Sequence, residues 1–227
     1  LGKTSQGHEI WINRALMECD VKILTGFIEP HFFAGYSGGG KAVMPGMAGL
    51  ETILGNHCAA NIAHPRATFG ATHGNPIWEE IREVACAANA TFLVNVTLNR
   101  GQEITGIFAG DLESAHAAGV EFVRRSAMVA VDGLYDIVIT GNSGHPLDLN
   151  LYQAVKGLSA ASRIVRPGGM ICMAASCWDG IPDHGHFKQL LADAESPERI
   201  LKTIMNPGFQ MQDQWQAQIL AQVLQRA

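Results

Sequence analysis

Three successive glycines and a lysine, Gly38, Gly39, Gly40 and Lys41, form the segment of this sequence best suited to chemistry. Successive glycines let the backbone approach a ligand closely, and their N–H groups can form a nest that binds an anion. A lysine beside such a nest is either the counter-ion of a phosphate or a nucleophile that anchors a ligand covalently. A flexible surface loop with a solvated lysine is the alternative. The aromatic residues just before the glycines disfavour it.

Counted from Gly35, the same segment has the Gly-x-x-x-x-Gly-Lys spacing of a phosphate-binding P-loop. That motif needs a Ser or Thr after the lysine to hold magnesium, and Ala42 stands there instead. A P-loop also opens a helix, which Pro45 and Gly46 would interrupt. A P-loop-like domain that binds nucleotide or phosphate is therefore the weaker alternative.

Two histidines flank the lysine, His31 ten residues before it and His57 sixteen residues after it. Either one taken alone is more often structural than functional. A neutral imidazole at His57 could be one ligand of a borderline-soft metal. No second histidine or carboxylate stands at metal-binding spacing around it. The other ligands of such a metal would have to come from a cofactor.

A second group of polar side chains falls in a helix expected near residues 149–161. Tyr152 and Lys156 are four residues apart and Gln153 and Lys156 three apart, so all three lie on one side of that helix. A lysine beside an amide can hold a carboxylate by charge-assisted hydrogen bonds. An ordinary solvent-facing Gln/Lys pair remains the alternative. Trp215 lies in a later helix, where a tryptophan is usually a core residue.

The composition indicates a folded globular protein and excludes several classes of function. Hydrophobic residues make up 47% of the 227 residues and charged residues 16%, and the formal net charge is -5. An acidic chain with no basic cluster is not a nucleic-acid binder. No apolar stretch approaches the roughly 20 residues of a membrane-spanning helix. Five cysteines without a Cys-x-x-Cys pair favour a reducing cytoplasm over a disulfide framework.

The hydrophobic pattern predicts an α/β fold made of two units with mostly parallel sheets. Strands are expected at residues 21–26, 92–98, 104–108, 135–141 and 170–175. The second and third of these form a hairpin. Helices are expected from residue 76, over 111–125 and 149–161, from 196, and over 214–226. Residues 28–49 should be a long shaped loop. The expected domains are residues 1–127 and 128–227.

The segment from Ile28 to Lys41, followed by Met44-Pro45-Gly46, resembles the signature of the nickel-pincer lactate racemase family. The pattern Pro146-x-Asp148-x-x-x-Tyr152-Gln153-x-x-Lys156 resembles a second element of the same family, about 110 residues further on. The two ordered matches support each other, and the resemblance spans essentially the whole chain.

The resemblance implies a role for each candidate residue. Lys41 would carry the cofactor, a pyridinium-3,5-bisthiocarboxylic acid mononucleotide, through a covalent bond. His57 would bind its nickel, and His31 would be one of two acid/base histidines. The cofactor-binding set implied by this resemblance is Phe33, Gly38, Gly39, Gly40 and Lys41. The implied substrate-binding set is Tyr152, Gln153, Lys156 and, more weakly, Trp215.

The activity implied is that of an isomerase which inverts the stereocentre of a lactate-like 2-hydroxy acid by hydride transfer to the nickel-pincer cofactor. The active site would lie in the cleft between the two α/β units. The protein would also interact with the enzymes that make and insert the cofactor. The family's other acid/base histidine and a substrate-binding arginine would precede Leu1, so the isolated 227 residues are expected to be inactive. A non-catalytic homologue of the same fold is the remaining alternative.

Overall fold

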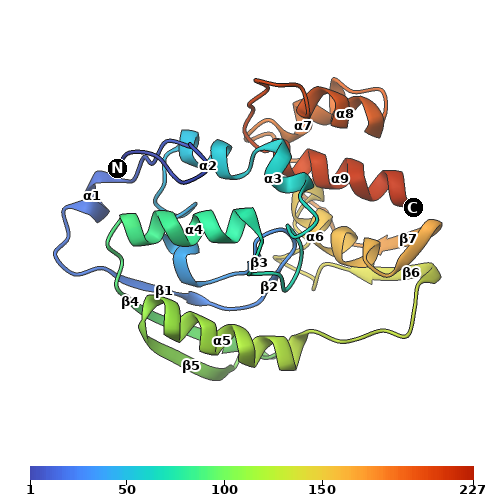
Figure 1. Cartoon of the computed structure of the whole chain (residues 1–227). Helices are drawn as coiled ribbons and strands as arrows, with labels where there is room; N and C mark the ends of the chain where they lie inside the picture. Colours follow the sequence, from blue (N-terminus) through green and yellow to red (C-terminus); the bar gives the residue numbers. More distant parts are fainter. The chain divides into compact units, whose positions relative to one another are not determined.

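A computed structural model describes all 227 residues, and the chain divides into two compact units. Unit 1 contains residues 1–57 and 63–129, and unit 2 contains residues 58–62 and 130–227. Both units combine helices with sheets, and each contains a parallel pair of strands, so the predicted α/β class is confirmed (Figure 1). The functional assignment of residues 1–127 and 128–227 as two domains stays a prediction.

Unit 1 is built on a three-stranded sheet of order β1-β4-β5. β1 (Ile23–Phe27) pairs with β4 (Phe92–Leu98) in parallel, and β4 pairs with β5 (Ile104–Asp111) in the expected antiparallel hairpin. Helix α5 (Leu112–Ala127) packs along this hairpin, as Figure 1 shows. The loop that contains the glycine run follows β1 directly. It therefore begins at the carboxyl end of a parallel strand, where ligands commonly bind in such sheets.

The two faces of this sheet are buried by other elements to different extents. In β4 the inward residues are Leu93, Asn95 and Thr97, while Phe92 and Leu98 are 43% and 39% exposed. The apolar alternation of the sequence therefore marks the more open face of β4. Large apolar side chains of the neighbouring strands, including Ile107 at 66%, are exposed with them.

The remaining elements of unit 1 are short except for one helix, α4 (Pro76–Ala87). The predicted loop at residues 28–49 contains two short strands that pair with each other and one turn of 3-10 helix, but no longer element. The short elements of unit 1 are α1 (Arg14–Met17), β2 (Pro30–His31), β3 (Gly35–Tyr36), η1 (Gly39–Ala42) and α2 (Leu50–Asn56).

Asn75 joins α4 to the loop. Its Oδ1 caps the helix by accepting from the N–H groups of Ile77 and Trp78, at 3.1 and 3.4 Å. Its Nδ2 donates to the carbonyl oxygens of Phe33 and Ala71, both at 2.9 Å, and the residue is fully buried. One side chain thus satisfies both the helix end and two buried carbonyls.

Replacing Asn75 by alanine is therefore expected to lower the free energy of unfolding by about 3 kcal/mol, because a cap is lost and two buried carbonyls lose their donor. The matched control is Asp111→Ala, which removes an exposed cap of α5 that accepts from the N–H of Ser114 and should cost about 1 kcal/mol. Denaturant unfolding followed by circular dichroism measures both. Equal losses would show that the two carbonyl bonds contribute nothing.

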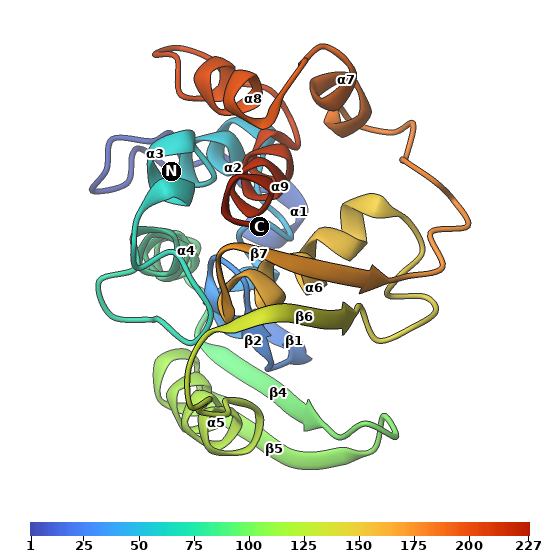
Figure 2. The ribbon, with the colours of Figure 1, turned by 90° about the vertical axis from the view of Figure 1, so that its right-hand side faces the viewer.

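Unit 2 contains a parallel pair of strands, β6 (Tyr135–Gly141) and β7 (Val165–Ala174), connected by helix α6 (Leu151–Ser162). This is the predicted strand–helix–strand order, and Figure 2 shows α6 beside the two strands. β7 begins five residues before the predicted start at 170. The sequence reading missed helix α7 (Phe187–Ala192), a short element that follows a stretch containing Gly180, Pro182 and Gly185.

Helices α8 (Pro197–Ile204) and α9 (Gln214–Arg226) complete unit 2, and α9 packs against α6, α7, α8 and β7. Most of helix α3 (Ala59–Ala63) also belongs to unit 2, where the Gln218 amide donates to the Ala59 carbonyl at 2.9 Å. None of the helices has both the length and the apolar character needed to cross a membrane.

Candidate functional site

Three of the predicted residues of unit 1 gather around the ring of Phe33. His31 and His57 both contact it edge-on, with ring centroids 4.5 and 5.0 Å away. The Lys41 amine lies 5.8 Å from the ring centroid. Phe33 is 4% exposed and His57 3%, so the phenyl ring and this imidazole are shielded from water, whereas Lys41 is partly exposed. Side chains spread over 27 positions of sequence therefore share one small region.

His31 is held by backbone donors. Its Nδ1 accepts from the N–H of Ala34 at 3.1 Å and from that of Phe33 at 3.4 Å. Its Nε2 faces the Lys41 amine at 3.4 Å. Because Nδ1 is an acceptor, Nε2 is the ring nitrogen through which His31 can exchange a proton with a molecule at Lys41.

His57 is held in its neutral form. It follows the last residue of α2, as the C-cap of that helix. Burial, and secondarily the charge of Lys41, lower the pKa of His57 to about 3. Neutral imidazole is the form that binds metals. No group of three or more His, Cys, Asp or Glu side chains in the structure could hold a metal ion, so any metal at His57 needs ligands from elsewhere.

The glycine run is clamped to the protein. The Gly39 N–H donates to Oδ1 of buried Asn95 at 2.8 Å, and Nε2 of His116 bonds the Ser37 carbonyl at 2.9 Å. A Cβ on Gly38 would lie 2.5 Å from the Asn95 oxygen, and one on Gly39 would lie 2.7 Å from the His116 ring. Both glycines also have positive φ, so larger residues are excluded by packing and by backbone conformation together.

This arrangement weighs against the phosphate-binding alternative. The Gly39 N–H is engaged by Asn95, and the Lys41 N–H donates to the Gly38 carbonyl at 3.1 Å. An anion nest would need those donors to be available. The helical turn after Gly38 is a four-residue 3-10 helix, not the helix that a P-loop opens. Contact of these glycines with a cofactor stays a prediction.

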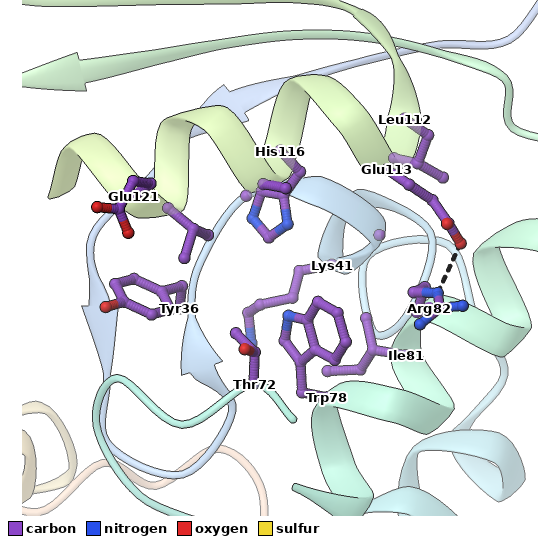
Figure 3. Close-up of a pocket in the computed structure, with 14 residues that line it drawn as sticks. Tyr36, Lys41, Thr72, Trp78, Ile81, Arg82, Leu112, Glu113, His116 and Glu121 are labelled. Carbon is purple, nitrogen blue, oxygen red and sulfur yellow. Dashed lines mark hydrogen bonds and ion pairs between the residues drawn. The ribbon is translucent and has the colours of Figure 1, made fainter. Parts of the chain in front are cut away.

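Lys41 also lines a cavity of about 260 Å³ in unit 1. Its other walls come from α4, α5 and the loop, and Figure 3 shows Trp78, Tyr36 and His116 around the same space as Lys41. An ion pair between Arg82 and Glu113, 2.6 Å long, closes one side. None of His31, Phe33 and His57 lines it. The sequence reading did not anticipate this cavity, since its lining is gathered from four separate segments.

The predicted residues of unit 2 also come together. Lys156 donates to Oε1 of Gln153 at 2.7 Å on the exposed side of α6. Trp215, from α9, donates its indole N–H to the Tyr152 hydroxyl at 3.2 Å. The Tyr152 hydroxyl donates in turn to Asp213 at 3.3 Å. The weakest of the sequence-based candidates, Trp215, is thus tied directly to another.

Sequence reasoning gave no site role to three residues that hold these groups in place. His116 is a buried structural residue that fixes the glycine loop. Asn95 stands at an inward position of β4, on the face opposite to the apolar alternation of the strand, so the sequence carried no signal for its burial. Asp213 had no local signal, because its partners lie far away in the sequence.

Comparison with known proteins agrees with the two sequence motifs. Residues 1–70 match the family model described as the lactate racemase N-terminal domain, and residues 131–227 match the lactate racemase C-terminal domain. The chain belongs to the lactate racemase family. It is 41% identical over 226 residues to the lactate racemase of Thermoanaerobacterium thermosaccharolyticum. It is 42% identical over 227 residues to that of Lactiplantibacillus plantarum.

Each alignment with these lactate racemases covers 99% of this chain and 53% of the relative, so the chain spans about half the length of the curated relatives it matches. The solved lactate racemase apoprotein of T. thermosaccharolyticum superposes with a TM-score of 0.93, covering 98% of this chain and 54% of that one. A Thermotoga maritima protein superposes with a TM-score of 0.66 at 19% identity, over 92% of this chain and 53% of that one. That second likeness concerns the fold alone.

Proposed function

We propose that this member of the lactate racemase family acts in an isomerase that inverts the stereocentre of a lactate-like 2-hydroxy acid. The observation that carries the proposal is the grouping of Lys41, His31 and His57 around Phe33. It places an amine, a proton-exchanging imidazole and a neutral, buried imidazole within one small region. The curated relatives at 41–42% identity are lactate racemases, which is the reason for the substrate class.

The cofactor we propose is nickel held by a pyridinium-3,5-bisthiocarboxylic acid mononucleotide on Lys41. The donor set fits such a group. His57 offers one neutral nitrogen, and no group of three or more His, Cys, Asp or Glu side chains could hold a metal ion, so a metal at His57 would take most of its ligands from the organic group. Lys41 offers an amine for a covalent bond. When bound, this group would supply the hydride acceptor that the protein's own side chains lack.

In this proposal each candidate side chain of unit 1 has a separate role. Lys41 anchors the organic group, and His57 binds the nickel. His31 exchanges the proton of the substrate hydroxyl at Nε2, the nitrogen directed toward Lys41. Phe33, buried between them, keeps water away from this side and holds the rings in place.

The side chains of unit 2 would bind the substrate. The Lys156 ammonium and the Gln153 amide are already hydrogen-bonded to each other on α6. An ammonium beside an amide can hold the carboxylate of a 2-hydroxy acid by charge-assisted hydrogen bonds. Tyr152 and Trp215 would bound the pocket with aromatic surface.

We also propose protein partners and a cellular compartment for this protein. A covalently held cofactor requires enzymes that make and insert it, and these are the protein partners we propose. The five cysteines are all free thiols, which supports a reducing compartment such as the cytoplasm.

The proposal is tested by the intact mass and nickel content of the protein after co-expression with cofactor-making enzymes of a lactate racemase system. We expect an adduct that maps to the Lys41 peptide and about one nickel per chain, in line with a single metal-binding histidine. A protein that binds neither under conditions that load an authentic lactate racemase would refute the proposal. An adduct on another residue would refute the anchor.

A further inference from the structure

Asp213 has an unusual place at the start of α9. It is 7% exposed, and its backbone has φ 68° and ψ 5°, the left-handed conformation that residues other than glycine rarely adopt. An aspartate just before a helix ordinarily caps the helix with its carboxylate. Here the side chain makes no capping hydrogen bond. Its carboxylate is turned toward other parts of unit 2.

Both carboxylate oxygens of Asp213 have partners there. Oδ1 accepts from the Tyr152 hydroxyl at 3.3 Å, and Oδ2 accepts from the N–H of His186 at 3.2 Å. Gly185 lies so close that a Cβ at that position would stand 1.8 Å from Oδ2. The carboxylate is therefore fixed between the 185–186 loop and α6.

This contact decides how the Tyr152 hydroxyl is used. Burial, and next the negative charge of Asp213, raise the pKa of Tyr152, so the phenol keeps its proton. That proton is donated to Asp213, and the oxygen accepts from the indole N–H of Trp215 at 3.2 Å. The ring of Phe187 meets Tyr152 edge-on at 5.3 Å. The hydroxyl thus orients the indole of Trp215 and has no proton left for a substrate.

We propose that Asp213 is a positioning residue of the substrate pocket, which acts through the Tyr152 hydroxyl to fix the indole of Trp215 beside α6. This inference rests on the proposed function for its consequence, since the pocket is that of the 2-hydroxy acid. It assigns Tyr152 and Trp215 as rigid aromatic walls and leaves carboxylate binding to Gln153 and Lys156. The orientation of the walls then governs which side chain of the substrate is accepted.

The test is a double-mutant cycle in the cofactor-loaded enzyme, with Asp213→Asn, Tyr152→Phe and both together. Asparagine keeps the size of the side chain and tolerates the left-handed backbone. We expect Asp213→Asn to lower kcat/KM for lactate about tenfold, the lower end for one charge-assisted hydrogen bond, mainly by raising KM. In the Tyr152→Phe background the same change should alter kcat/KM by less than about twofold. Asp193→Asn, which removes an exposed carboxylate at the end of α7, is the matched control.

A second readout does not depend on activity. In enzyme labelled with ¹⁵N-tryptophan, the indole signal of Trp215, assigned with Trp215→Phe, should shift in both Asp213→Asn and Tyr152→Phe and stay in place in Asp193→Asn. If Asp213→Asn fails to fold, Tyr152→Phe alone must still move that signal. An unmoved signal, or an equal effect of Asp213→Asn in both backgrounds, would overturn the inference. A shifted signal in an enzyme without racemase activity would overturn the proposed function and leave the Asp213–Tyr152–Trp215 coupling intact.

Discussion

In a preparation of the enzyme that is active before the substitution, Lys41→Arg is expected to abolish both the cofactor adduct and racemisation. The covalent bond needs an amine that can lose its proton, and a guanidinium remains charged under all ordinary conditions. The positive charge near His57 and Phe33 is kept, so the loss is chemical and not electrostatic. Intact mass spectrometry measures the adduct, and chiral chromatography of a 2-hydroxy acid measures turnover.

The matched control for this prediction is Lys202→Arg, an exposed lysine in α8 outside both groups of candidate residues. It should keep the adduct and full turnover. Thermal unfolding of Lys41→Arg should stay close to that of the parent protein, because the substituted side chain is only partly buried. An adduct or undiminished racemisation in Lys41→Arg would show that the anchor lies elsewhere.

The two histidines are expected to give opposite phenotypes. His57→Ala removes the one imidazole proposed to bind nickel, so nickel content should fall while the adduct on Lys41 remains. His31→Ala should keep adduct and nickel but reduce turnover about 10²- to 10⁴-fold, the usual contribution of a general acid or base. The measurements are nickel analysis, intact mass and chiral turnover on the same preparations.

Two further variants make the comparison sharp. His57 is 3% exposed and packs against Phe33, so its truncation also leaves a cavity. His57→Gln fills much of that space and should still lose nickel, which separates ligand loss from unfolding. His73→Ala, at an exposed position, is the control for loss of an imidazole. Identical nickel and turnover losses in the His31 and His57 variants would contradict their separate roles.

Much of the fold could be predicted because its signals are local. The Asn75-Pro76 start of α4, the hairpin of β4 and β5 and the β6–α6–β7 order all follow from turn residues, caps and periodicity within short windows. The face of β4 that the fold buries was not predictable in this way. The apolar alternation from Phe92 to Leu98 marks the exposed face, while Asn95 and Thr97 point inward. Burial depends on which elements cover a sheet, which a strand's own sequence does not contain.

The candidate site likewise has features that the sequence shows and features that only the tertiary structure shows. The sequence by itself determined which residues have suitable chemistry, because Lys41, His31 and the Tyr152–Lys156 helix stand in dense, ordered motifs. Only the tertiary structure decided that Phe33 joins Lys41 to both histidines, and that Trp215 is bonded to Tyr152. It alone also showed Asn95 and His116 holding the glycine loop and Asp213 holding Tyr152. The hydrogen bonds among these residues join positions 56 to 79 apart. They arise from packing of whole elements, and no local pattern encodes them.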